Sequence, residues 1–145
     1  MTLTVRKYTV SDLQEVLSTW EKASNLAHPF LSADFQDQVR HDIPKLHLPN
    51  AETWVAEIDS NVVGFIALLG NDVGALFVQP TFHGKGIGKA LMDKAVELYG
   101  QLELEVFKAN AIGRKFYARY GFEDVSEEVH EATGNKVLRL KYSTG

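Results

Sequence analysis

The stretch His83-Gly84-Lys85-Gly86-Ile87-Gly88 decides the fold, because it places glycines between an apolar, strand-like run and an amphipathic helical pattern. Such a junction gathers unpaired N–H groups at the positive end of a helix, where anions such as phosphate bind. Glycine lets the oxygens of an anion approach the backbone, and we expect this of Gly84, Gly86 and Gly88. The plainer alternative is a tight strand-to-helix turn that simply needs glycine.

Two other glycine-rich phosphate loops do not fit this spacing. A Walker loop ends in Gly-Lys-Ser/Thr, whereas Gly88-Lys89 is followed here by Ala90. A dinucleotide-binding fold places Gly-x-Gly-x-x-Gly after the first strand of a parallel unit. Here the spacing is Gly-x-Gly-x-Gly, and it follows strands that we expect to be antiparallel.

The regions on both sides of the loop alternate between strand and helical periodicity. Upstream, residues 3–8 indicate a strand, and residues 12–26 and 32–43 indicate helices. Ser11 and Ser32 are the expected N-caps, Gln14 would complete a capping box, and Pro44 would weaken the second helix. Further strands and helices are expected, in chain order, at residues 53–58, 62–69, 73–78, 86–99, 102–106, 111–120, from 122 onward and around 137–140. The predicted order is βααβββαβαββ.

Composition limits the classes of function. The chain of 145 residues has the size of one domain, and without a repeat or linker we expect a single domain over residues 1–145. Cysteine is absent, which excludes disulfides, thiolate zinc sites and a cysteine nucleophile within this chain. The net charge of −4 argues against nucleic acid or an anionic membrane as partner and favours a cationic one. Residues 1–6 lack the apolar run of a signal peptide, so we expect a cytoplasmic protein.

A second motif lies about 20 residues after the loop: Asn110-Ala111-Ile112-Gly113-Arg114-Lys115-Phe116-Tyr117-Ala118-Arg119-Tyr120-Gly121-Phe122. It is similar to the N-x-x-A-x-x-F-Y-x-x-x-G-F segment of the GNAT superfamily of acyl-CoA N-acyltransferases. The run Leu76-Phe77-Val78-Gln79-Pro80 and the loop after it resemble that family's Gln/Arg-x-x-Gly-x-Gly/Ala signature, which follows a strand ending in Val-x-Pro. His83 departs from the usual Arg or Gln. The stretch at residues 27–31 further resembles small bacterial YjaB-type members.

The resemblance covers nearly the whole chain and implies fold, cosubstrate and reaction. The fold would be α/β (α+β), with a mixed, mostly antiparallel sheet of about seven strands flanked by about four helices. Acetyl-CoA would be the cosubstrate, without a metal. The loop amides would bind its pyrophosphate with Lys85 and Lys89 nearby, while Asn110 would bind pantetheine or cap its helix, and Arg114 would lie near the phosphates or the adenosine. The expected cosubstrate residues are Leu76, Phe77, Val78, His83, Gly84, Lys85, Gly86, Ile87, Gly88, Lys89, Asn110 and Arg114.

The same resemblance implies direct attack of an acceptor amine on the thioester. Tyr117 would be the general acid, since a phenol with a pKa of about 10 stays protonated at neutral pH; alternatively it packs on the sheet. Glu103 and Glu105 share one face of their strand, and Glu105, nearer the cosubstrate end, is the candidate base. Both would be ordinary surface charges if that face met solvent.

The acceptor groove is less well defined by sequence. His28 lies in the loop between the first helices, which forms one wall of the acceptor groove in the family, and Phe30 and Trp20 are candidate apolar wall residues. A structural or exposed role is the alternative for His28. The acidic residues Glu123, Asp124, Glu127, Glu128 and Glu131 would form a solvated face or steer a cationic amine.

The sequence therefore predicts transfer of an acetyl group to a primary amine of a small molecule or peptide. The alternatives are acetylation of protein N-termini or lysines, and a non-catalytic acyl-CoA sensor. A monomer or a homodimer is expected, and loops that vary across the family determine the acceptor.

Overall fold

The computed structural model describes residues 2–144, so Met1 and Gly145 of the expected domain lie outside the described residues. Its centre is a seven-stranded sheet in the order β1-β2-β3-β4-β5-β7-β6. Neighbouring strands are antiparallel except β4 and β5, which are parallel. The strands are β1 (Leu3–Lys7), β2 (Glu52–Ile58), β3 (Asn61–Leu69), β4 (Asp72–Val78), β5 (Gln101–Phe107), β6 (Glu123–Val129) and β7 (Lys136–Ser143). The predicted order and the mostly antiparallel sheet are confirmed.

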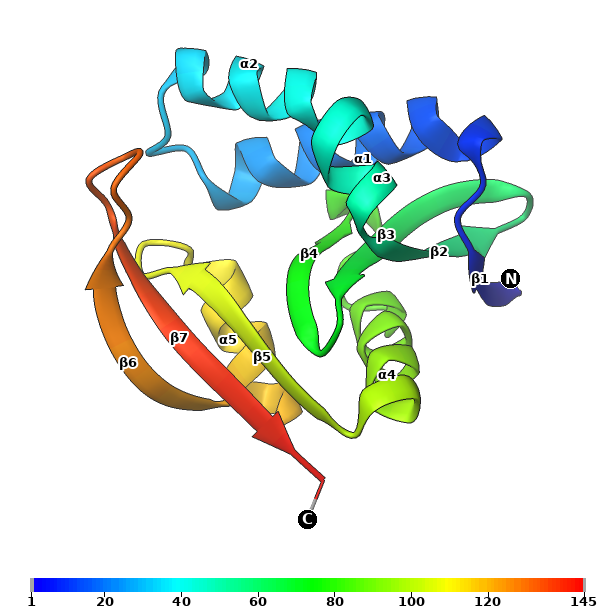
Figure 1. Ribbon diagram of the computed structural model, residues 1–145. Coiled ribbons are helices and arrows are strands. Elements are labelled where there is room, and N and C mark those ends of the chain that lie inside the picture. The colour runs from blue at the N-terminus through cyan, green and yellow to red at the C-terminus, as the bar shows by residue number, and fades with distance from the viewer. Residues whose placement is uncertain (1, 145) are drawn as a thin grey trace.

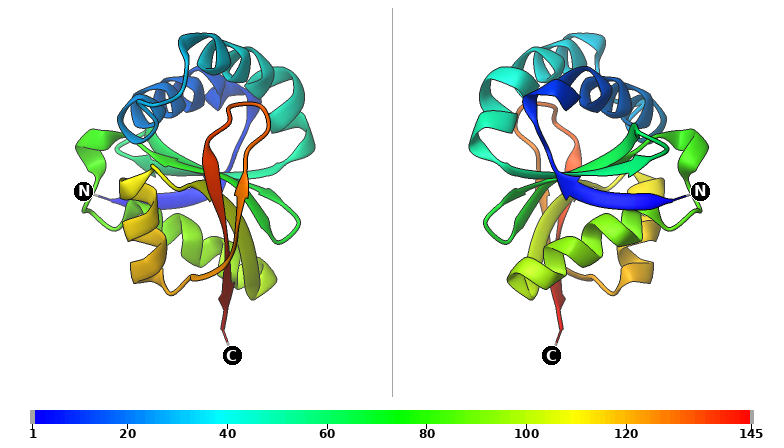
Figure 2. Two further views of the ribbon diagram at one scale, coloured as in Figure 1. Left: turned by 90° about the vertical axis from the view of Figure 1, so that its left-hand side faces the viewer. Right: turned by 90° about the vertical axis from the view of Figure 1, so that its right-hand side faces the viewer.

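Helices cover both faces of the sheet (Figures 1 and 2). On one face lie α1 (Leu13–Ala27), α2 (Ala33–Asp42) and the short α3 (Leu48–Asn50), and on the other lie α4 (Ile87–Tyr99) and α5 (Ala111–Tyr120). Each layer buries its own apolar cluster: Val16 of α1 packs with Phe65 of β3, whereas Leu91 of α4 packs with Leu104 of β5. The centre of the sheet is therefore buried on both faces, whereas the edge strand β6 is exposed along its length.

The sheet splits between β4 and β5. These strands pair only at Asp72–Glu103 and Val73–Leu104 and then diverge (Figure 1). From Gly74 onward, β4 is bonded to β3 on one side only. The split leaves an open strand edge inside the molecule, with the helical layer of α1 and α2 above it.

Of the two predicted N-caps, one needs correction and the other is confirmed. Ser11 is not the N-cap of the first helix, because a 3-10 turn (Val10–Asp12) precedes α1 and Asp12 accepts a hydrogen bond from the Thr9 amide, at 2.9 Å. The ionised Asp12, which also pairs with Arg6, is a stronger acceptor than a hydroxyl. Ser32 is confirmed as a cap, since its Oγ accepts from the Phe35 amide at 3.1 Å.

The chain does not leave the helical path at Pro44. It continues through a π-helical turn (Ile43–His47), in which the Leu48 amide bonds to the carbonyl of Ile43, five residues back. Proline has no N–H to donate to the previous turn, and the wider turn restores hydrogen bonding beyond it. In the described part of the chain, no helix has the length and apolar character needed to cross a membrane.

Candidate active site

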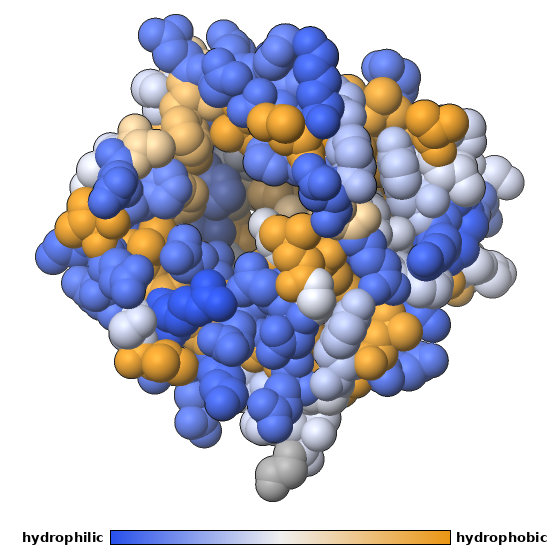
Figure 3. Space-filling view, in the orientation of Figure 1, coloured by the Kyte–Doolittle hydropathy of each residue, from blue (hydrophilic) through white to orange (hydrophobic). Residues whose placement is uncertain are grey.

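A groove of about 730 Å³ lies where β4 and β5 diverge, between the sheet and the layer of α1, α2 and α3. Figure 3 shows it as a hollow on the face seen in Figure 1, with apolar side chains around its rim. The groove brings together predicted site residues from separate elements: Trp20, His28, Leu76, Phe77, Glu105, Asn110 and Tyr117. Residues expected to bind cosubstrate and residues expected to bind the acceptor therefore share one cavity.

The open edge of β4 forms one wall of this groove. The Gln79 amide donates to the Val63 carbonyl of β3, at 2.8 Å. Because N–H groups alternate in direction along a strand, the Val78 amide points away from β3 and into the split, as does that of Leu76. The Val78 side chain is buried, whereas Leu76 and Phe77 line the groove. The unpaired amides can accept a further extended ligand as an extra strand.

The glycine-rich loop offers a row of unpaired amides. Among residues 2–144, no backbone carbonyl bonds to the amides of residues 84–89, and the first bonded amide is that of Ala90, to the Gly86 carbonyl at 3.0 Å. Gly84 and Gly86 have φ of +79° and +81°, which is the left-handed region that favours glycine. No atom lies within 4 Å of a Cβ built at either residue. This arrangement fits an anion at the start of α4.

Gly88 serves a different purpose from the one expected. A Cβ there would lie 3.0 Å from Cε1 of Phe116 on α5, so glycine is required for the close packing of α4 on α5. Its Cα is turned toward that helix, and only its amide remains available to an anion. The glycine spacing therefore meets two requirements: a left-handed backbone at Gly84 and Gly86, and close packing of α4 on α5 at Gly88.

The side chains around the loop differ in the hydrogen bonds and ion pairs that they make with the rest of the protein. His83 Nε2 lies 2.8 Å from the Val78 carbonyl, so this nitrogen carries hydrogen and donates. Lys89 pairs with Asp93 at 2.8 Å, and Arg114 donates to the Lys108 carbonyl at 3.1 Å. Lys85 makes no ion pair within the described residues. The imidazole of His83 thus anchors the loop to the end of β4.

Tyr117 projects from α5 into the groove. Its side chain is buried and packs edge-on against the rings of Phe116 and Phe122. Burial raises the pKa of the Tyr117 phenol to about 12, because the charged phenolate would lose its solvation. The packing role and the groove-lining role proposed for Tyr117 are compatible, and the phenol is firmly protonated.

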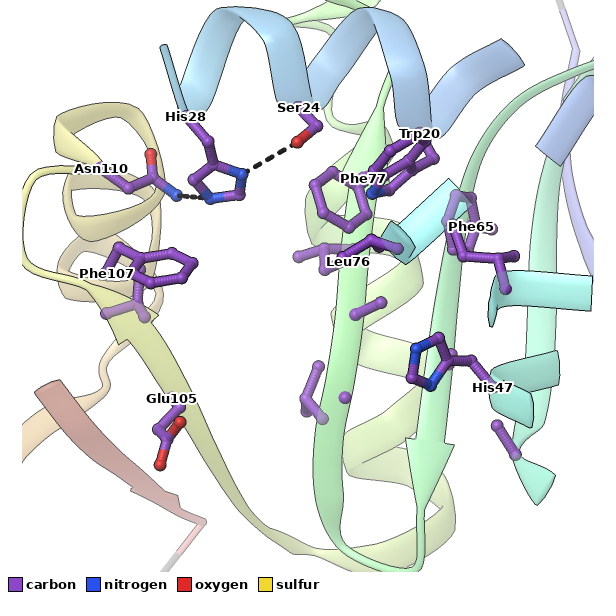
Figure 4. A pocket seen from close by; sticks show the side chains of 18 of the residues that line it. Trp20, Ser24, His28, His47, Phe65, Leu76, Phe77, Glu105, Phe107 and Asn110 are labelled. Carbon is purple, nitrogen blue, oxygen red and sulfur yellow. Dashed lines mark hydrogen bonds between the residues drawn. The ribbon is translucent and has the colours of Figure 1, made fainter. Parts of the chain in front are cut away.

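A chain of hydrogen bonds connects α1 with α5 at one end of the groove (Figure 4). Asn110 caps α5 through its Oδ1, which accepts from the Gly113 amide at 2.9 Å. Its Nδ2 is then the group that donates to His28 Nε2, at 3.3 Å, so His28 Nδ1 carries hydrogen toward Ser24 Oγ, at 3.1 Å. Burial lowers the pKa of His28 to about 4, which keeps the ring neutral near pH 7.

Of the other residues predicted to contact the acceptor, some line the groove and one does not. Glu105 lines the groove, whereas Glu103 on the same strand face lies 3.5 Å from Arg139. Trp20 lines the groove beneath Arg40, whose guanidinium carbon is 5.7 Å from the ring centre. Phe30 is not among the lining residues, and its ring instead packs on those of His28 and Phe107.

Two histidines that line the groove were not among the predicted site residues. His47 enters from the π-helical turn and lies across the groove from Glu105 (Figure 4). His130 enters from the turn between β6 and β7, and its ring centre lies 5.3 Å from that of Phe107. Neither belongs to a motif, and the π-helical turn that orients His47 has no periodic signal. Among residues 2–144, no group of three or more His, Asp or Glu side chains is placed to hold a metal ion.

The family follows from a direct comparison. Residues 49–124 match the model described as "Acetyltransferase (GNAT) domain". The chain belongs to the GNAT acetyltransferase family. It is 33% identical to peptidyl-lysine N-acetyltransferase YiaC of Escherichia coli over 122 residues. The aligned region covers 83% of this chain and 84% of YiaC. It is 30% identical over 124 residues to peptidyl-lysine N-acetyltransferase YjaB of E. coli, over 85% of this chain and 84% of YjaB.

Solved structures agree with this GNAT assignment. The solution structure of apo-form YjaB from E. coli superimposes with a TM-score of 0.87 at 28% identity, covering 98% of both chains. The crystal structure of PaiA N-acetyltransferase from Thermoplasma acidophilum in complex with coenzyme A has a TM-score of 0.78 at 20% identity, over 98% of this chain and 100% of PaiA. The resemblance to PaiA shows that the two proteins share a fold.

Proposed function

We propose that this GNAT protein transfers the acetyl group of acetyl-CoA to the ε-amine of lysine in a peptide or protein. The observation that carries the proposal is that Tyr117 and Glu105 line one groove beside the unpaired edge of β4. YiaC and YjaB, which match most of this chain, are named as peptidyl-lysine N-acetyltransferases. Among the acceptors expected from the sequence, these two relatives favour the lysine side chain.

The loop and β4 would hold the cosubstrate. The unpaired amides of residues 84–89 would bind the pyrophosphate at the positive end of α4. The free N–H groups of Leu76 and Val78 would bond to the amide-containing pantetheine arm, as an added strand does. Bound acetyl-CoA supplies a thioester whose carbonyl carbon is open to attack. The Val78 amide is the donor that we assign to the thioester oxygen.

Glu105 would prepare the acceptor. A lysine ammonium has a pKa of about 10.4 and must lose a proton before its nitrogen can attack. Glu105 is the only carboxylate among the groove-lining residues within 2–144, and it would take that proton directly or through a water molecule. The neutral amine would then form the new C–N bond while the C–S bond breaks.

Tyr117 would assist the departure of sulfur. A phenol whose pKa is raised to about 12 remains protonated and can donate as negative charge grows on sulfur. Its proton would move to sulfur as the C–S bond breaks, giving free CoA thiol. The second proton, lost by the amine nitrogen as the amide forms, would restore the phenol, and the first, lost by the ammonium before attack, would reach solvent by way of Glu105. No covalent enzyme intermediate is required.

The direct test measures thiol release from acetyl-CoA with three peptides. One contains a single lysine and a blocked N-terminus, the second has a free N-terminus and no lysine, and the third contains acetyl-lysine. We expect thiol release only with the lysine peptide, accompanied by the mass increase of one acetyl group. Release with the second peptide alone would indicate an N-terminal acetyltransferase. Binding of acetyl-CoA without release for any amine would contradict catalysis and support a sensor.

A further inference from the structure

The two ends of the groove differ in how they are closed. At one end, the helical layer contacts the C-terminal half through His28 and Asn110, and through the rings of Phe35 on α2 and His130 in the β6–β7 turn, whose centres lie 6.0 Å apart. Figure 1 shows the β6–β7 turn beside the start of α2, with the β3–β4 turn at a distance from it. Toward the β3–β4 turn the groove lining includes exposed side chains, so this is the side from which an acceptor can reach Glu105.

Exposed leucines lie on both walls at this open side. Leu46, in the π-helical turn, is 54% exposed, and Leu69, at the end of β3, is 51% exposed, yet both line the groove. Large aliphatic side chains that contribute to a concave surface mark a place where another apolar group binds. One leucine comes from the helical layer and the other from the sheet, so a bound side chain would contact both walls.

The charged side chains that line the groove favour a cationic ligand over an anionic one. Among the described lining residues, Glu105 carries the only carboxylate, and neither lysine nor arginine is present. The groove lining can therefore compensate one cationic group, at Glu105, and it offers no lysine or arginine to an acidic side chain. Arg139, which lies opposite Glu105 across the β5–β7 pair, is already paired with Asp72 at 2.8 Å. Most of the remaining surface is aliphatic or aromatic, which favours apolar atoms next to the ammonium.

The size of the groove leaves room beyond the acceptor side chain. Its volume of about 730 Å³ is that of a pocket for a drug-sized ligand, for which about 300–1,000 Å³ is usual. The acetyl end of the pantetheine arm, at the edge of β4, would take part of this volume, and a lysine side chain would add only four methylenes and one ammonium. A neighbouring side chain of the same peptide can occupy the apolar part between Leu46 and Leu69.

We propose that the preferred acceptor is a lysine flanked by a bulky apolar residue, whose side chain binds between Leu46 and Leu69. This inference rests on the proposed function and adds a sequence preference to it. The lysine ammonium lies at Glu105 and the apolar neighbour lies at the open side of the groove. Acidic neighbours disfavour binding because they would be desolvated without a partner.

Three blocked peptides of equal length test the preference, with the lysine flanked on both sides by Leu, Ser or Asp. For the wild-type protein, we expect kcat/KM for the Leu-flanked peptide to exceed that for the Ser-flanked peptide by at least about tenfold, a typical effect of an apolar contact in a pocket. The Asp-flanked peptide should be the poorest. Leu46→Gln and Leu69→Gln should each reduce the advantage of the Leu-flanked peptide.

Leu98→Gln is the matched control, because Leu98 on α4 is 40% exposed and does not line the groove. It should keep the full preference. Thermal unfolding of each variant identifies any loss of fold. Equal kcat/KM for the Leu-flanked and Ser-flanked peptides in the wild-type protein would overturn the inference and leave the proposed function standing. Absence of acetylation of all three peptides, with acetyl-CoA bound, would overturn the proposed function and the inference together.

Discussion

At the scale of single residues, Tyr117 shows how burial in the apolar core changes the pKa of a polar side chain. The rings of Phe116 and Phe122 surround it, and burial raises the pKa of its phenol to about 12. An ordinary tyrosine, with a pKa of about 10, begins to lose its proton at mildly alkaline pH. In the proposed mechanism, Tyr117 would therefore keep its proton over the whole pH range in which a lysine acceptor becomes neutral, so the proposed acid and acceptor would be in their active forms together.

Removal of the Tyr117 hydroxyl should separate binding from chemistry. Tyr117→Phe keeps the ring and its packing, so we expect near-normal acetyl-CoA affinity by calorimetry and kcat lower by roughly 10²–10⁴-fold, the scale of a general acid. Tyr99→Phe is the control, because Tyr99 donates to Glu52 outside the groove. Wild-type kcat in Tyr117→Phe, with binding intact, would exclude the phenol from the mechanism.

His28 should make the stability of the fold depend on pH. Burial lowers the pKa of His28 from 6.5 to about 4, so the unfolded state takes up the proton first as the pH falls. Its contribution to the free energy of unfolding is complete above about pH 6.5 and is lost between that pH and about 4. A protonated ring would also present a second N–H to Asn110 Nδ2, which is itself a donor.

Urea unfolding at pH 7 and pH 5 tests this linkage. We expect His28→Gln to lose less free energy of unfolding between the two pH values than the wild type does. His41→Gln replaces an exposed imidazole and should behave like the wild type. An identical pH dependence in His28→Gln and wild type would show that His28 titrates alike in the folded and unfolded states.

At the scale of elements, the start of α4 depends on left-handed glycines, and a matched pair of substitutions separates strain from binding. Gly86 (φ +81°) and Gly134 (φ +74°, in the β6–β7 turn) have similar backbones, and a Cβ meets no atom within 4 Å at either. Gly86→Ala and Gly134→Ala should therefore cost similar stability, about 1 kcal/mol. We expect only Gly86→Ala to weaken acetyl-CoA binding in calorimetry, by tenfold or more. Equal affinities for the two variants would refute the role of the loop in binding.

The elements were largely predictable from sequence because each satisfies its own periodicity. The helix at residues 111–120 and the strand at 73–78 carry apolar positions at regular spacing, and both were found. The π-helical turn at Ile43–His47 was not, because proline predicts an interruption without specifying how the chain continues. The cap predicted at Ser11 was wrong because the competing acceptor, Asp12, pairs with Arg6, six residues earlier in the chain.

The candidate site was predictable where family motifs carried it and, for Glu105, from the period of two along its strand. The loop at residues 83–88, Asn110 and Tyr117 belong to those motifs, and the structure brings the last two into the groove. The bond between His28 and Asn110 joins residues 82 positions apart, so no local pattern announces it. Phe30 was expected in the wall because it neighbours His28, but the loop turns its ring behind that residue.

At the scale of the whole molecule, the incomplete pairing of β4 with β5 is the feature that creates the site. Two residue pairs join the strands, and beyond them the amides of Leu76 and Val78 point into the split without a strand partner. The divergence also separates the wall carrying Glu105 from the wall carrying Phe77, which makes room for the acceptor.

Amide hydrogen exchange can show whether acetyl-CoA completes the open edge. The Val78 amide points into the split, whereas the next amide, that of Gln79, bonds to Val63. Without ligand, we expect Val78 to exchange faster than Gln79 by NMR, and saturating acetyl-CoA should slow exchange at Val78 and change Gln79 little. Unchanged exchange at Val78 in the saturated protein would contradict strand-like binding of the pantetheine arm.

The split between β4 and β5 also has a consequence for the order in which the protein acquires its parts. The β2–β3–β4 meander and the β6–β7 hairpin each close over short stretches of chain, and such local closures are fast. The parallel junction of β4 with β5 requires α4 to cross over first. A newly made chain that has formed both antiparallel pieces but not this junction would have most of its strands and no groove. If acetyl-CoA binds as proposed, competence to bind it would be acquired when the two pieces join, and a ligand that bridges them would favour the joined form by mass action.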